Sequence, residues 1–351
     1  MARSSDAETI RGRTFILSLT REAEARLAES ARGQGLVPVD CALLDPEANI
    51  DFPIYLYDQS LSSFVQLKAA ERASTVAELQ KLWRGRSRPV FVPRDFAKSL
   101  TSFAASNLRE LASKPDASTR QVYAIAKALL TGVFSAECDL ERLEESSRSV
   151  SDAISDLIDT GGDALRRIIL AQSHDPTIYT HSLNVCVLGT ALSSHLRLYA
   201  SKEERRSLAQ GFLLHDLGKM DISPEILLKP TKLTTKEFEE IKMHPIYGYE
   251  RVKELKAISE RGRRIVLEHH ERCDGSGYPH GLTRDQISEA GRICAIVESY
   301  EDLTSERPYH KPVSVFQALK LMQEEGMGKY DTAVFKAFIN FFRSISISSF
   351  R

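Results

Sequence analysis

The sequence predicts a mainly α-helical protein, with an all-helical C-terminal domain preceded by a small N-terminal α/β domain and connecting helices. Residues 13–95 hold short segments rich in β-branched and aromatic side chains, separated by Gly, Pro, Asp or Ser. From residue 96 onward, apolar residues recur at the spacing of three and four that is typical of helices. The 351 residues also exceed what one core usually holds, so we expect two domains, 1–150 and 151–351.

The N-terminal region is predicted to form five strands and one helix. The strand-like segments span 15–19, 36–44, 52–58, 62–70 and 89–95, and the helix-like segment spans 74–85. The sequence here contains no phosphoacceptor pattern and no Gly-rich nucleotide loop. We therefore expect a sensory or regulatory module.

Three helical segments follow, at 96–113, 119–134 and 140–160. Because they lie between two dissimilar regions, they are candidates for a stalk or a homodimer interface. Packing against their own domain is an equally good interpretation. From residue 165 to the end the pattern stays helical, and the loops between these helices gather the residues with chemical potential.

Composition excludes several classes of function. Apolar residues make up 42% of the chain and charged residues 27%, and the net charge is −1, so we expect no affinity for a nucleic acid polymer or a membrane surface. No apolar run approaches the roughly 20 residues that span a bilayer, and the first residues lack the apolar core of a secretory signal. The five cysteines have no CxxC spacing, which favours reduced thiols in the cytoplasm.

The histidines indicate a metal site, because all nine lie beyond residue 173. His215 and Asp216 end one apolar run, and His269 and His270 end another just before a Gly-rich turn. Neutral imidazoles held at helix ends are typical metal ligands. Successive helical residues point about 100° apart, so we expect His269 and His270 to serve two ions, or one ion and a substrate oxygen. Two further histidines lie at helix boundaries: His181 and His244.

A carboxylate among several imidazoles favours a pair of cations, because the two oxygens of Asp216 can each bind one. Nitrogen and oxygen ligands without thiolate favour iron, manganese, nickel or zinc. Two such ions can activate a shared water for attack on phosphorus. Lys219 follows Asp216 by three residues, so it can hold the scissile phosphate or protonate the leaving oxygen. We expect Gly218 to let the substrate approach the backbone.

The motifs, in this order, resemble the HD-GYP family, the bacterial branch of the HD phosphohydrolases that hydrolyses the second messenger cyclic di-GMP. The resemblance runs from about residue 175 to residue 342. It rests on DPTIYTHSLNV at 175–185, HDLGK at 215–219, ILLKPTKLT at 226–234, MHPIYG at 243–248, HHERCDGSGYPHGL at 269–282 and LTSERPY at 303–309.

The resemblance implies a role for each matching residue, within an all-helical HD-GYP bundle. The catalytic residues would be Asp216 and Lys219. The metal ligands would be His181, His215, Asp216, His244, His269, His270 and Glu298. Substrate would be bound by Lys219, by the loop residues Asp274, Gly275, Gly277, Tyr278 and Pro279, and by Arg307, whose planar guanidinium suits a guanine or a phosphate.

The chain departs from the family pattern at its acidic positions. Glu298 and Glu301 stand where the family has Asp, and the extra methylene moves each carboxylate outward by about 1.5 Å. Either glutamate is a candidate ligand. Thr177 stands where some relatives have a carboxylate for a third ion, so we expect two metals.

We therefore expect hydrolysis of cyclic di-GMP to linear pGpG, with GMP as a possible end product, through a binuclear metal centre and a metal-bridging hydroxide. The two divalent transition metal ions are expected to be iron or manganese, with nickel or zinc as further options. One alternative is a weakly active or inactive module that binds cyclic di-GMP or a protein partner. Another is a phosphodiesterase for a second cyclic dinucleotide such as cyclic GMP-AMP. A diguanylate cyclase (GGDEF) protein is a candidate partner.

Overall fold

The computed structural model describes part of the chain, and its residues group into two compact units, Met1–Asn107 and Leu108–Arg351. The described residues are 7–10, 13–16, 27, 30–31, 33–40, 52–58, 61–67, 89–113, 122–123, 125–127, 129–130, 139–159, 178–227, 229, 231–305, 311–326 and 328–347. The helix expected at 74–85 lies outside them. The division at residue 107 falls within the first of the connecting helices expected from the sequence.

The first unit contains a six-stranded sheet in which every pair is antiparallel. Its strands are β1 (Ala7–Ile10), β2 (Arg13–Ile16), β3 (Leu36–Asp40), β4 (Tyr55–Asp58), β5 (Ser63–Gln66) and β6 (Pro89–Pro93). The order is β1-β2-β4-β6-β3, with β5 paired to β4. Leu36 and Phe91 pack with Ala31 in a small buried cluster. The five predicted strand segments overlap β2 to β6, and β1 was not predicted.

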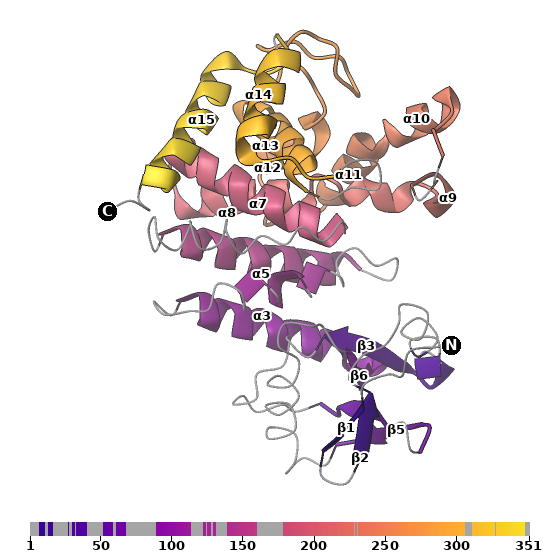
Figure 1. Cartoon of the computed structure of the whole chain (residues 1–351). Helices are drawn as coiled ribbons and strands as arrows, with labels where there is room; N and C mark the ends of the chain where they lie inside the picture. The colour runs from indigo at the N-terminus through magenta and orange to yellow at the C-terminus, as the bar shows by residue number, and fades with distance from the viewer. Residues whose placement is uncertain are drawn as a thin grey trace. The chain divides into compact units, whose positions relative to one another are not determined.

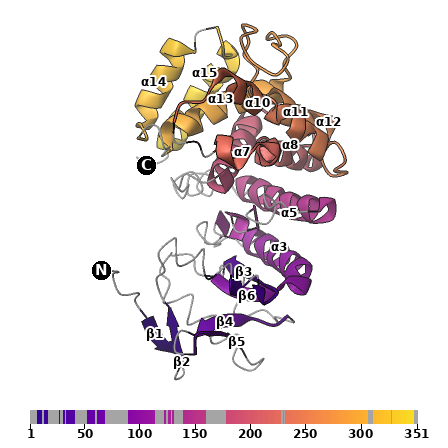
Figure 2. The same ribbon diagram turned by 90° about the vertical axis from the view of Figure 1, so that its right-hand side faces the viewer.

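The second unit is helical among its described residues (Figures 1 and 2). After α3 (Ala97–Ser113), which crosses the division, come α5 (Leu140–Asp159), α7 (Ile178–His195), α8 (Lys202–Leu214), η4 (Leu217–Asp221), α9 (Pro224–Leu227), α10 (Thr235–Ile241), α11 (His244–Val252), α12 (Glu260–Glu268), α13 (Glu289–Thr304), α14 (Val315–Glu325) and α15 (Thr332–Ile347). The predicted fold class, mainly α with a small N-terminal sheet, is confirmed.

Helix α7 is the centre of the helical unit and contacts α5, α8, α13 and α15 (Figure 1). It is buried on nearly all sides, as expected of a helix surrounded by others. Leu183, Leu188 and Phe212 are fully buried in this core. Helix α5 packs on α8, where Gln210 Nε2 donates to Ser147 Oγ at 2.8 Å. Among the described helices, none is long and apolar enough to cross a bilayer.

Serine caps fix where the site-bearing helices begin. Ser201 accepts from the backbone N–H of Glu204 at 3.1 Å, Ser259 from that of Gly262 at 3.4 Å, and Ser288 from that of Gly291 at 3.0 Å. Each such cap is worth about 1 kcal/mol. With the starts of α8 and α12 fixed, their last turns bring His215 and His269 to defined positions.

Candidate metal centre

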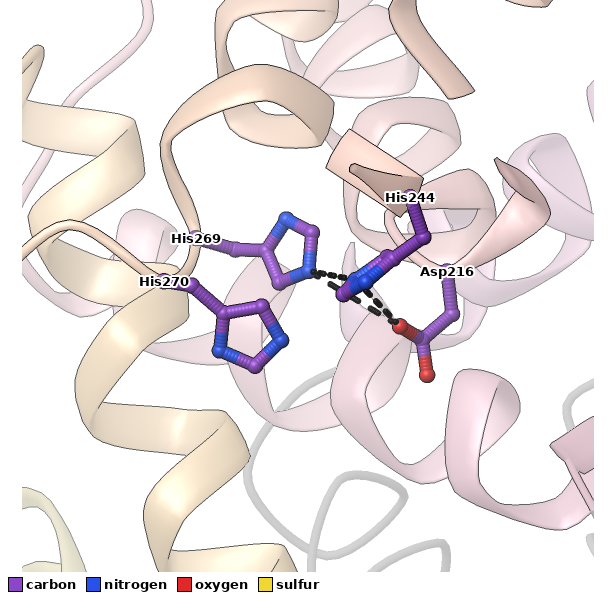
Figure 3. Close-up of side chains that lie close together, drawn as sticks. All are labelled: Asp216, His244, His269 and His270. Carbon is purple, nitrogen blue, oxygen red and sulfur yellow. Dashed lines mark hydrogen bonds and ion pairs between the residues drawn. The ribbon is translucent and has the colours of Figure 1, made fainter. Parts of the chain in front are cut away.

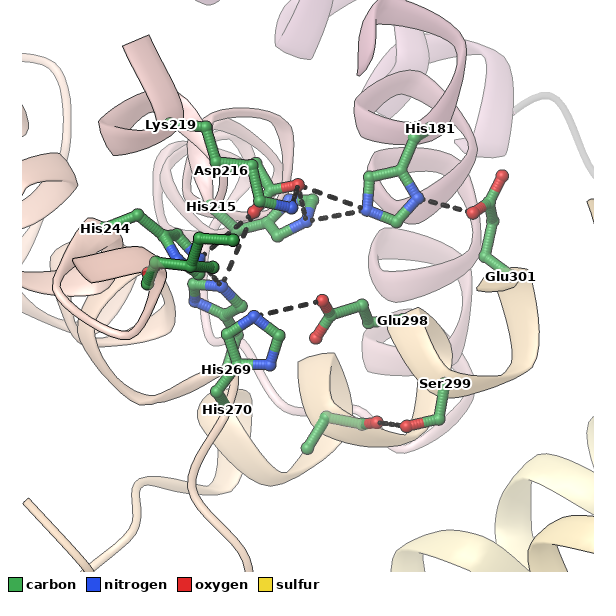
Figure 4. A network of polar contacts seen from close by, with 12 residues as sticks. His181, His215, Asp216, Lys219, His244, His269, His270, Glu298, Ser299 and Glu301 are labelled. Atoms are coloured by element: carbon green, nitrogen blue, oxygen red, sulfur yellow. Dashed lines mark hydrogen bonds and ion pairs between the residues drawn. The ribbon is translucent and has the colours of Figure 1, made fainter. Parts of the chain in front are cut away.

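Four helix ends and two helix faces converge on one buried cluster of side chains (Figure 4). His215 is the C-cap of α8, His269 is the C-cap of α12, and His244 is the first residue of α11. Asp216 lies between α8 and η4, and His270 directly follows His269. The remaining members are His181 on α7, Lys219 on η4, and Glu298 and Glu301 on α13.

Gly218 allows α11 to approach this cluster. A Cβ atom at Gly218 would lie 2.0 Å from the carbonyl oxygen of His244 and 2.4 Å from the backbone nitrogen of Gly248. No side chain fits there, because real Cβ contacts are longer than 3.0 Å. The structure thus gives Gly218 a packing role, in place of the substrate approach that we expected from the sequence.

Three of the imidazoles are oriented by the end of the helix that precedes them. The Nδ1 atoms of His215, His244 and His269 lie 2.8, 2.7 and 2.8 Å from the carbonyl oxygens of the residues three positions earlier. A carbonyl can only accept, so each ring donates from Nδ1. Each neutral ring therefore presents the lone pair of Nε2 to the cluster, which is the form that binds a metal.

The two oxygens of Asp216 face two pairs of imidazoles. Oδ1 lies 3.3 Å from His244 Nε2 and 3.7 Å from His269 Nε2 (Figure 3). Oδ2 lies 3.4 Å from His181 Nε2 and 3.5 Å from His215 Nε2. The Asp216 side chain is 1% exposed, so both of its oxygens face imidazole nitrogens inside the buried cluster.

The donor set fits divalent metal ions. His244 Nε2 and His269 Nε2 lie 3.0 Å apart although both rings donate from Nδ1, so two lone pairs face each other. Among the described residues, Asp216 Oδ1 and Glu298 Oε2 are buried polar atoms without a hydrogen-bond partner. A divalent cation held by these residues would relieve both the lone-pair repulsion and the cost of the unpaired buried oxygens. Three groups of described residues each have ligand atoms within 4.8 Å of one another: Asp216, His244, His269 and His270; His181, His215 and Glu298; and His181, Glu301 and Asp302.

Helix α12 ends at Glu268, so His269 is its C-cap and His270 follows it. Both rings thus lie beyond the helix, and their ligand atoms join one group. His270 Nε2 also lies 3.5 Å from Glu298 Oε1, so the longer Glu298 side chain still reaches the cluster. Glu301 instead accepts a hydrogen bond from His181 Nδ1, on the side of that ring away from Asp216.

Charges in the cluster are strongly coupled. Burial opposes the charged form of Asp216, but the Lys219 ammonium, 2.6 Å from Oδ2, and the surrounding histidines together hold the pKa of Asp216 well below its ordinary value. Burial and the charges of Asp302 and Asp216 raise the pKa of Glu298 to about 8. Burial lowers the pKa of His269 to about 4.

His181 behaves differently, because burial is outweighed by Glu301, which raises the pKa of His181 to about 9. In the metal-free protein a proton therefore occupies Nε2, where a cation would bind. Metal binding on this side has to displace that proton.

The loop after His270 packs its aromatic residue on the cluster. The Tyr278 ring stacks on the His270 ring with a centroid distance of 4.6 Å. A Cβ atom at Gly277 would lie 2.4 Å from the backbone nitrogen of Arg272, so only glycine fits. Glu271 fixes the far side of the loop by accepting from the N–H groups of His280 at 2.7 Å and Leu282 at 2.9 Å.

The other predicted substrate residues are placed less directly. Asp274 is exposed, and its Oδ1 accepts from the N–H and hydroxyl of Ser276 at 3.0 and 2.6 Å. Gly275 has a φ of +79°, which favours glycine, and Pro279 follows Tyr278 in the same loop. Arg307 and Thr177 lie outside the described residues.

Sequence reasoning missed several buried residues that support the cluster. Asn184 donates to Glu301 at 3.0 Å, Ser305 donates to Glu301 at 2.6 Å, and Glu268 accepts from Ser288. The one available signal was position: Asn184 and Ser305 lie three and four residues from His181 and Glu301, on the same helical faces.

Comparisons with known proteins agree with this geometry. Residues 164–334 match the HD domain family. The chain is 38% identical over 177 residues to "Cyclic di-GMP phosphodiesterase PA4108" of Pseudomonas aeruginosa, which covers 50% of this chain and 42% of that protein. It is 33% identical over 174 residues to "3'3'-cGAMP-specific phosphodiesterase 3" of Vibrio cholerae, which covers 50% of this chain and 37% of that protein. The chain thus spans less than half the length of these curated relatives.

A solved structure supports the fold. The HDG"Y"P protein Bd1817 from Bdellovibrio bacteriovorus matches with a TM-score of 0.63 at 19% identity, over 88% of this chain and 99% of that one. At this identity the match shows the fold alone. Residues 164–334 are therefore an HD domain, and the resemblance of the chain to the HD-GYP family is confirmed.

Proposed function

We propose that the metal cluster hydrolyses cyclic di-GMP to linear pGpG, with GMP as the product of a second cleavage. The observation that carries this proposal is Asp216, whose two oxygens each face a pair of imidazole nitrogens. Relatives that are 38% identical are named cyclic di-GMP phosphodiesterases, which supports this substrate.

The residues would hold two divalent ions. Asp216, His244, His269 and His270 would surround one, and His181, His215 and Glu298 the other, with Asp216 shared. The absence of thiolate favours iron or manganese, with nickel or zinc as further options. Such a pair supplies Lewis acidity, which activates water and neutralises phosphate charge.

Lys219 would act on the phosphate. Burial works against its charge, but the Asp216 carboxylate raises the pKa of Lys219, so it stays protonated at neutral pH. Its side chain is 26% exposed, so the ammonium can leave Asp216 for a phosphate oxygen. In that position it would bind the non-bridging oxygen or give a proton to the departing one.

The loop after His270, which contains Gly277, Tyr278 and Pro279 and is called the GYP loop, would bind a guanosine. Tyr278 stacks on His270 and is partly exposed, so its ring can close one wall beside the ions. Gly275, Gly277 and Pro279 shape that wall, and Asp274 holds the turn. Arg307 is proposed as the arginine that contacts the guanine or phosphate.

The direct test is turnover of cyclic di-GMP by the full-length protein, freed of metal and then loaded anaerobically with Fe²⁺ or Mn²⁺. We expect pGpG to appear with metal and to be absent with chelator. Glu298→Asp and Glu298→Gln are the matched variants, because the first keeps the carboxylate and the second removes its charge. Intact substrate with two bound ions, in both wild type and Glu298→Asp, would indicate a module that binds without turnover.

A second substrate has an observation in its favour. Two relatives at 33% and 34% identity are named 3'3'-cGAMP-specific phosphodiesterases. A side-by-side comparison of kcat/KM for the two cyclic dinucleotides decides between them, and we expect cyclic di-GMP to be preferred.

A further inference from the structure

A chain of buried hydrogen bonds connects His181 to the segment before α5. The Tyr123 hydroxyl donates to Asn184 Oδ1. Asn184 Nδ2 donates to Glu301 Oε1 at 3.0 Å, and Glu301 Oε2 accepts from His181 Nδ1. These residues are between 2% and 6% exposed, and they come from segments 61 and 117 residues apart.

Each link fixes the direction of the next one. A carboxylate can only accept, so the Asn184 amide has to present Nδ2 to Glu301. Its Oδ1 then faces the Tyr123 hydroxyl, which can donate. The reversed amide would place its oxygen against the Glu301 oxygen, so the network has one consistent orientation. Glu301 in turn fixes the His181 ring, with Nε2 toward Asp216 at 3.4 Å.

Tyr123 is delivered to this network by packing. The described residues between 122 and 130 are helical, and those on one face are buried at the spacing of a docked helix: Val122, Ile125, Ala126, Leu129 and Leu130. Apolar contacts suffice to dock such a helix. A phenol hydroxyl buried behind them is costly unless it has a partner, and its partner belongs to the metal centre.

We propose that Tyr123 is a positioning residue for the metal centre. Through Asn184 and Glu301 it holds His181 in the orientation that binds a divalent cation beside His215. Displacement of the 122–130 segment frees the Asn184 amide, loosens Glu301 and lowers cation affinity in this half of the cluster. A movement of the connecting region would thereby change the cation affinity of the proposed active site. This inference rests on the cluster binding cations, as proposed above, but not on its substrate.

The test measures Mn²⁺ binding to the metal-free, full-length protein. Tyr123→Phe removes the hydroxyl and keeps the ring. We expect one of two Mn²⁺ ions to bind about fivefold to tenfold more weakly, somewhat less than the loss typical for a direct partner of a ligand, and the other to keep its wild-type affinity. Tyr199→Phe is the matched control. It removes a hydroxyl that donates to Ser194 Oγ at 2.7 Å and takes no part in the cluster.

Two further variants make the test decisive. Asn184→Leu cuts the chain one step nearer the metal, so it has to weaken the same ion at least as much, and it decides the matter if Tyr123→Phe does not fold. In the Tyr123→Phe/Glu301→Gln double variant the losses should be less than additive. Wild-type isotherms for Tyr123→Phe, or additive losses, overturn the proposal. If wild-type protein binds two Mn²⁺ ions but leaves cyclic di-GMP intact, the proposed function is wrong and the role proposed for Tyr123 is unaffected.

Discussion

The two halves of the candidate metal centre differ in how one imidazole, that of His181, is held. On one side of Asp216, His244 and His269 donate from Nδ1 to the carbonyl groups of Ile241 and Val266, in the last turns of α10 and α12. On the other side, His181 donates to the side chain of Glu301, 120 residues later in the chain. The first arrangement is local, and the second depends on tertiary packing.

The difference has a simple physical origin. The last carbonyl groups of a helix lack partners within the helix. A histidine placed just after the helix end can satisfy one of them through Nδ1, and its Nε2 then points outward. His215 follows the same rule with Phe212 of α8. His181 lies inside α7, where carbonyl groups are already used, so its ring needs an acceptor from another helix.

The largest expected effect comes from the residue that both halves share. Asp216→Asn leaves one oxygen and no charge, so neither pair of imidazoles keeps its anionic partner. We expect cyclic di-GMP hydrolysis to fall by about a thousandfold or more, which corresponds to roughly 4 kcal/mol of barrier. Steady-state kinetics with metal analysis of the same samples measure this loss. Retention of two tightly bound ions in Asp216→Asn would show that Asp216 is no bridge.

Glu301→Gln separates the two halves. Gln keeps the length but loses the charge, and its amide cannot accept from Asn184, Ser305 and His181 as the carboxylate does. Outer partners of metal-binding histidines are typically worth 10-fold to 100-fold in metal affinity, so we expect a loss of about that size for one ion only.

Isotherms for Mn²⁺ measure the effect of Glu301→Gln, and Glu289→Gln serves as control because that carboxylate is exposed at the start of the same helix. Equal weakening of both ions would remove the distinction between a local and a remote half.

The same distinction explains what the sequence could predict. The structure brings the seven residues named as ligands into two groups that could hold a metal ion, and a third such group joins His181 to Glu301 and Asp302. The order of the motifs identifies these seven residues. Their position at helix ends that follow apolar runs explains why most of them lie close together. The role of Glu301 could not be predicted, because only the packing of α7 against α13 shows which carboxylate turns toward His181.

Other misses share this cause. Gly218 is required by the approach of α11 to η4, and the sequence of the HDLGK motif says nothing of α11. The last residue of α12 decided how His269 and His270 point, and such boundaries are uncertain by one or two residues. Strand β1 is only four residues long and finds its partner in β2, so its AETI sequence carried little signal.

Stability against pH distinguishes the two halves again. In the folded, metal-free protein the pKa of His269 is lowered to about 4. Its neutral ring therefore costs stability only below pH 6.5, where the unfolded chain takes up a proton and the folded chain does not. The pKa of His181 is raised to about 9 and that of Glu298 to about 8, so both groups hold protons that the unfolded chain has released. Stability therefore falls as pH rises from 6.5 toward 9.

Thermal unfolding of the metal-free protein between pH 6.5 and 9 measures this decline. Added Mn²⁺ should reduce it, because the cation replaces the protons on His181 and Glu298 and binds more strongly as pH rises. A metal-free protein whose Tm rises over this range would contradict the assignment of those protons to the His181 half.

The smallest effect is expected at Asp274, which tests whether the GYP loop follows the local rule. Its Oδ1 accepts from the N–H and hydroxyl of Ser276, so the carboxylate holds its own turn. Asparagine offers the same acceptor, and we expect kcat/KM for Asp274→Asn within about twofold of wild type. Asp274→Ala loses the acceptor and should lose about fivefold, or roughly 1 kcal/mol. If the negative charge instead binds a guanine, Asn and Ala will lose equally, and the loop then contributes a substrate contact that its hydrogen bonds do not reveal.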